Sequence, residues 1–166
     1  KKEVEDKGYT QLKQDLKTGQ LCTVYVFHGE ETYLREYYLD QLRKKLIPAG
    51  FEEFNYHKLE GKALSVQALS DIVEALPMMC EKTLVTVTDF DLFKLNEEQR
   101  GQLIALLSDF PDYCCLVFVY DILEYKPDKK MKKLYTALTS TAQIVEFKTQ
   151  GQSDLINWVT RRFKAL

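Results

Sequence analysis

Paired cysteines, histidines and long apolar runs are scarce in this sequence of 166 residues. Its four cysteines form no C-x-x-C pair, and only two histidines accompany them. This set is too sparse for a zinc site and is typical of a protein kept in a reducing compartment. No apolar run is long enough to span a bilayer, and no signal-peptide pattern is present. We therefore expect a cytoplasmic protein without a metal, a cofactor or a membrane partner.

An excess of one charge is also lacking. The 23 basic and 25 acidic residues leave a formal net charge of −2, so no global field selects nucleic acid. Any contact with nucleic acid has to be local or supplied by partners. Apolar residues, in contrast, make up 45% of the sequence. That fraction suffices for the core of a domain and excludes wholesale disorder.

Apolar strand patterns alternate with amphipathic helix patterns along the sequence. Strict β/α alternation with strands rich in Val, Ile and Leu predicts an α/β fold, a five-stranded parallel sheet flanked by helices on both faces. We expect residues 1–148 to form this domain, and residues 149–166 to be a linker and the first helix of a truncated second domain. The expected strands are 21–29, 51–61, 82–90, 114–121 and 142–148, and the expected helices are 9–19, 30–46, 64–76, 96–110, 127–140 and 153–166.

The turn after the first strand reads GEETYLRE, where a phosphate-binding loop would need G-x-x-x-x-G-K-[ST]. Gly29 fits the first glycine of that motif. Leu34 then replaces the second glycine, Arg35 the lysine and Glu36 the Ser/Thr. A leucine side chain blocks the phosphate cradle and the neighbouring carboxylates repel phosphate. The sequence therefore predicts a degenerate nucleotide site.

Acidic residues at other strand ends leave two further interpretations open. Asp89 follows the third strand, where a Walker-B aspartate would hold magnesium, but no catalytic glutamate follows it; a turn cap is the commoner role. With Glu30–Glu31 and Lys148, Asp89 also matches the outline of a phospho-acceptor receiver domain. Tyr120–Asp121 stand where that fold needs a Ser or Thr and would repel a phosphoryl group.

A cluster of lysines opens the helix expected at 127–140. It could contact DNA phosphates, or it could be an ordinary solvated helix face. The cluster consists of Lys126, Lys129, Lys130, Lys132 and Lys133.

The junction ALPMMCEKTL (75–84) is unusually apolar for a segment between a helix and a strand. We expect Leu76 to face the core with the rest of its helix, and Pro77 to end that helix. Met78 and Met79 then either project outward, as flexible plugs for a partner's apolar pocket, or pack under the sheet edge.

Several stretches of the sequence resemble the N-terminal part of the delta-subunit family of bacterial DNA polymerase III. The resemblance spans nearly the whole chain, and its most specific parts are GFEEFNY…LEG and the LP-apolar-apolar junction. The stretches are VFHGEETYLREYYLDQLRKKL, GFEEFNYHKLEGK, LPMMCEKTLVTVTDFD and LINWV.

The resemblance implies an AAA+ module that has lost its nucleotide site. It further implies that Leu76, Pro77, Met78 and Met79 form an element that binds the beta sliding clamp and opens the ring for loading on primed DNA. Other clamp-loader subunits, joined through C-terminal domains, would use the ATP, so this chain would not be an enzyme. The alternative is an active P-loop NTPase or a phospho-receiver switch on the same sheet.

Overall fold

Five parallel strands form one sheet in the order β2-β3-β4-β1-β5. This computed structural model describes residues 7–149 and 152–165, with residues 152–158 as backbone alone. The arrangement confirms the expected α/β fold with a five-stranded parallel sheet. The strands are β1 (Val24–His28), β2 (Tyr56–Glu60), β3 (Thr83–Thr88), β4 (Cys114–Val119) and β5 (Ala142–Glu146).

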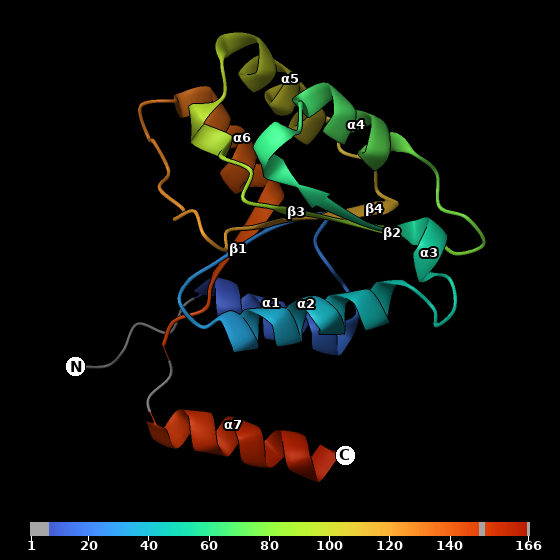
Figure 1. Ribbon diagram of the computed structural model, residues 1–166, viewed down its shortest axis with the longest axis vertical. Coiled ribbons are helices and arrows are strands. Elements are labelled where there is room, and N and C mark those ends of the chain that lie inside the picture. Colours follow the sequence, from blue (N-terminus) through green and yellow to red (C-terminus); the bar gives the residue numbers. More distant parts are fainter. Residues whose placement is uncertain (1–6, 150–151, 166) are drawn as a thin grey trace.

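Helices cover both faces of the sheet, as Figure 1 shows. One face carries α4 (Val66–Glu74), α5 (Glu97–Ser108) and α6 (Lys132–Thr141), and the other carries α1 (Lys7–Thr18) and α2 (Thr32–Leu46). The shorter elements and the last helix are α3 (Glu52–Asn55), η1 (Gly61–Ala63), η2 (Leu92–Lys94) and α7 (Gln152–Ala165). The expected linker includes residues 150–151, which lie outside the described residues.

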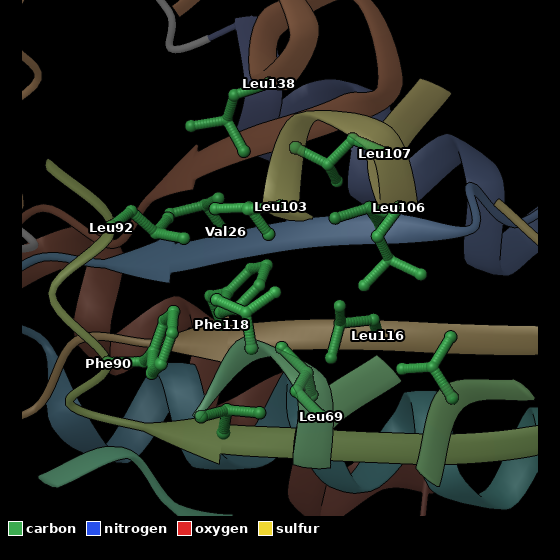
Figure 2. Packing of buried hydrophobic residues seen from close by; sticks show 14 of the residues in the cluster. Val26, Leu69, Phe90, Leu92, Leu103, Leu106, Leu107, Leu116, Phe118 and Leu138 are labelled. Atoms are coloured by element: carbon green, nitrogen blue, oxygen red, sulfur yellow. The ribbon is translucent and has the colours of Figure 1, made fainter. Parts of the chain in front are cut away.

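Two apolar clusters, one on each face, form the core. Every side chain of β4 is buried, because this strand is central and successive side chains alternate between the faces. Leu116 and Phe118 point to the cluster under α4–α6, where Figure 2 shows them among the leucines of α5. Val117 and Val119 point to the cluster under α1 and α2.

Local signals mark three of the helix ends. The Ser65 hydroxyl accepts a hydrogen bond from Ala68 N at 3.1 Å and the Asn96 side chain accepts one from Gln99 N at 2.8 Å, so both residues are N-caps. Gly19 has φ +79° and ends α1. No helix in the described ranges is apolar over a length that would cross a membrane.

The strand predicted at 51–61 is partly wrong. Residues 52–55 form the single turn α3, and β2 begins only at Tyr56. The apparent alternation of apolar residues was misleading, because Phe54 is exposed and Asn55 is completely buried. Burial of Asn55 depends on hydrogen bonds to distant residues, which a period of two does not reveal.

The helix predicted at 64–76 ends earlier than expected. It ends at Glu74, and Ala75 is already extended with ψ 131°. A residue before proline avoids the helical region, so Leu76 leaves the helix. Leu76 is 72% exposed, and the expectation that it faces the core is wrong.

The helix predicted at 127–140 begins only at Lys132. The Asp128 carboxylate accepts a hydrogen bond from Lys130 N at 2.9 Å, and Met131 N donates to Asp128 O at 3.1 Å. Asp128 therefore makes a turn that competes with the helix. Lys126, Lys129 and Lys130 precede the helix in this turn segment, whereas Lys132 and Lys133 lie in its first turn.

Candidate functional site

The loop after β1 is too short and too tightly packed to wrap a phosphate. Gly29 has φ +115°, and a Cβ at this position would lie 2.4 Å from Phe147 O. Glu31 N donates to the same carbonyl at 3.0 Å. Since α2 begins at Thr32, the rest of the P-loop register is already helical and cannot form the extended loop that wraps a phosphate.

The side chains that replace the nucleotide motif serve the protein itself. Leu34 is buried in the cluster beneath α2. Arg35 is 1% exposed, and its guanidinium donates to Tyr120 O at 3.1 Å and to Asp121 Oδ1 at 2.6 Å. Glu36 is exposed, 3.8 Å from the Arg35 guanidinium. Arg35, at the lysine position of the motif, therefore pairs with the carboxylate of Asp121 in the same protein rather than with a ligand.

Asp89 caps the loop that follows β4. Its backbone has φ +56°, and Oδ1 accepts hydrogen bonds from the N–H groups of Asp121 at 2.9 Å, Ile122 at 3.1 Å and Leu123 at 3.0 Å. A magnesium ligand needs free lone pairs, so this geometry favours the turn-cap interpretation. Among the side chains that the structure describes, no group of three His, Cys, Asp or Glu is arranged to hold a metal ion.

The cysteines of the core are poor nucleophiles. Burial raises the pKa of Cys114 to about 11 and raises the pKa of Cys115 further. The thiolate is the reactive form, so neither residue supports covalent chemistry at neutral pH.

The segment Leu76–Met79, here called the apolar tip, projects from the loop between α4 and β3. Leu76 is 72%, Met78 53% and Met79 85% exposed, so both methionines point outward instead of packing under the sheet edge. In Figure 1 this loop lies at the margin of the molecule next to α3. Because it joins a helix to a strand, it lies at the amino ends of the strands, at the opposite end from the degenerate nucleotide site.

Asn55 contacts the apolar tip and was missed by the sequence analysis. Its side chain bonds both main-chain polar groups of Met78. The FNY triplet within the stretch 51–61 was an available signal, because a polar residue between two aromatic ones needs a specific partner when buried.

The lysine cluster is solvent-exposed along its whole length but divided between two elements. Lys126 lies 3.4 Å from Glu124, and Lys129 lies 6.0 Å from the centre of the Tyr135 ring. The remaining members, Lys130, Lys132 and Lys133, are also exposed. A local positive surface therefore exists, although not as one helix face.

Known proteins resemble this chain in sequence and in fold. The family model described as "DNA polymerase III, delta subunit" matches residues 25–148. The DNA polymerase III subunit delta of Bacillus subtilis is 28% identical over 141 residues, which cover 81% of this chain and 40% of that protein.

Two solved structures are similar to this chain in fold. The DNA clamp loader delta protein of Bacillus subtilis matches with a TM-score of 0.70 and 22% identity, over 90% of this chain and 45% of the other. A DNA polymerase III gamma subunit-related protein of Thermotoga maritima matches with a TM-score of 0.55 and 11% identity, over 91% of this chain and 49% of the other. The chain thus spans less than half the length of these relatives.

Proposed function

Because the chain belongs to the family of DNA polymerase III delta subunits, we propose that it binds the sliding clamp through its apolar tip and opens the ring for loading on primed DNA during replication. The observation that carries this proposal is the exposure of Met78 and Met79. They lie on a loop whose main chain is hydrogen-bonded by the buried side chain of Asn55.

The chemistry of the apolar tip suits a pocket on a partner. Adjacent exposed apolar side chains are unusual on a protein that works alone. Methionine is flexible and polarizable, so it can follow the shape of an apolar pocket. A few buried side chains of this kind can dominate the binding energy of an interface.

Ring opening follows from binding by linkage. The subunit shifts the clamp toward its open form only as far as it binds that form more tightly than the closed form. No chemical step by this chain is needed. Arg35 and Asp89 bond groups of the protein itself, which supports a non-catalytic subunit, with ATP used by neighbouring subunits.

Further partners belong to the same proposal. Other clamp-loader subunits would join through C-terminal domains beyond the part of the family spanned here, in the cytoplasm where replication takes place. Primed DNA would meet the exposed lysines Lys126, Lys129, Lys130, Lys132 and Lys133 through its phosphates.

Calorimetric titration against the bacterial beta sliding clamp tests the proposal. We expect wild type to bind, and the double variant Met78→Ala/Met79→Ala to lose about 2 kcal/mol or more of binding free energy, because hot-spot truncations cost this much.

A matched control is available at the other end of the sheet. Ile122 is 87% exposed, so Ile122→Ala truncates an exposed apolar side chain away from the apolar tip and should leave clamp affinity unchanged. Equal losses in both variants would indicate a nonspecific apolar contact. A wild type that does not bind the clamp contradicts the proposal and favours the alternative of an NTPase or phospho-receiver.

A further inference from the structure

We infer that Asn55 is the positioning residue of the apolar tip, because it grips the main chain of Met78 and so sets the direction in which Met78 and Met79 project. The inference deepens the proposed function and rests on it. Asn55 would not touch the clamp itself; it would act through the residues that do.

The contact uses both ends of the Asn55 carboxamide. Oδ1 accepts a hydrogen bond from Met78 N at 2.7 Å, and Nδ2 donates one to Met78 O at 2.9 Å. Nδ2 also donates to Phe51 O at 2.8 Å, which ties the side chain to its own turn, α3. Asn55 is 0% exposed, so water does not compete for these bonds.

Main-chain support for the apolar tip is otherwise missing within the described part of the chain. Neither Met78 nor Met79 bonds to another backbone group there. Flanking contacts secure only the ends of the loop: the Tyr113 hydroxyl donates to Glu74 O at 2.6 Å, and the Lys82 ammonium donates to Asp112 O. The centre of the loop therefore depends on Asn55.

Met79 needs this support because its backbone is strained. Its φ of +60° lies in the left-handed region, which residues with a side chain enter only at a cost. Without a fixed Met78 peptide, the loop would relax to commoner conformations. Binding would then require the partner to select a minor conformer, and apparent affinity falls with the population of that conformer.

The contact also separates positioning from recognition. Asn55 bonds only main-chain atoms of Met78. The same two hydrogen bonds can therefore form with a different side chain at position 78. A carboxamide is required at position 55, because the peptide offers one donor and one acceptor. A carboxylate of the same shape would accept from Met78 N but would face the Met78 carbonyl without a proton to donate.

Two variants and two measurements test the inference. N55A and N55D are titrated against the beta sliding clamp, and exchange of the Met78 amide proton is followed by NMR. We expect N55A to weaken clamp binding about tenfold, as the loss of two buried hydrogen bonds allows. N55D should weaken it at least as much, because its buried carboxylate would face the carbonyls of Met78 and Phe51 without a proton to donate. In N55A, exchange of the Met78 amide proton should be at least tenfold faster than in wild type, while the amides of β3 stay protected.

A double-mutant cycle distinguishes positioning from general stability. In the background of Met78→Ala/Met79→Ala, N55A should weaken clamp binding no further, because there is no longer an apolar pair to position. Leu138→Ala, in the core under α6, lowers stability without touching the apolar tip and should leave affinity unchanged.

Three outcomes overturn the inference: unchanged exchange at Met78 in N55A, a full additional loss in the double-mutant background, or an equal loss in Leu138→Ala. If wild type does not bind the clamp, the proposed function fails. The exchange measurement then still decides whether Asn55 holds the apolar tip.

Discussion

At the scale of single residues, Arg35 occupies the lysine position of a phosphate-binding loop but contacts the protein itself. In the P-loop register it stands where a lysine would meet phosphate. Here its guanidinium reaches the loop after β4, 86 residues along the chain, and bonds Asp121. The contact joins α2 to the loop at the carboxyl end of β4, the end of the sheet where a nucleotide would bind. The residue at the lysine position of the motif thus makes contacts within the protein.

Arg35→Ala should lower the free energy of unfolding by about 3 kcal/mol, because it leaves a cavity in place of a large buried side chain and removes the hydrogen bonds to Tyr120 O and Asp121. Urea denaturation measures the change. Asp121→Asn is the matched control: it keeps an acceptor, and Glu36, 3.8 Å from the guanidinium, remains as a counter-charge for the buried cation, so it should cost less than Arg35→Ala. Comparable losses in the two variants would show that the charge of Asp121 matters more than the burial of Arg35.

At the scale of elements, the glycine of the LEG triplet is explained by packing. Gly61 opens η1, and a Cβ there would lie 2.5 Å from both Cα and N of Phe90. The backbone after β2 therefore presses directly against the backbone after β3. Gly101, in the middle of α5, has nothing within 4 Å of a built Cβ. Two glycines of the same sequence have opposite structural requirements.

Gly61→Ala should destabilise the protein by about 2 kcal/mol, because backbone atoms have to move to admit the methyl group. Gly101→Ala should stabilise it by about 1 kcal/mol, since alanine is the better helix former and the site is open. Thermal unfolding of both variants checks the pair. A stable Gly61→Ala protein would show that the contact with Phe90 yields easily.

At the scale of the whole molecule, the two ends of the sheet differ in what they expose. Open α/β sheets bind ligands at the carboxyl ends of their strands, but here Arg35 and Asp89 fill that end with internal contacts. The exposed apolar tip lies at the amino ends, on a connection from helix to strand. The frame of a nucleotide-binding domain is retained, while the surface proposed for function lies elsewhere.

Magnesium and ATP together should leave the unfolding temperature unchanged. A ligand at one hundred times its dissociation constant would add about 2.7 kcal/mol of stability, a shift that is easily seen in a thermal melt. Acetyl phosphate with magnesium is the parallel probe for a receiver domain. A clear upward shift with either compound would contradict the degenerate site and revive the alternative of an NTPase or a switch.

Local patterns determined the outline of this protein from sequence alone. The β/α alternation predicted the parallel sheet. Ser65 and Asn96 cap their helices through neighbours three residues away, so such helix starts are encoded locally. Leu34 and Glu36 predicted a degenerate nucleotide site, because a phosphate loop is a contiguous motif. Such features are encoded within a few residues of one another.

Tertiary structure alone decided what those patterns left open. The main chain of Met78 is hydrogen-bonded by Asn55, 23 residues earlier in the chain. The direction of the Arg35 side chain depends on a loop beyond β4. Hydrogen bonds of this kind form only after the sheet has brought distant segments together, and their strength comes from the exclusion of water around them. No periodicity within either segment carries that information.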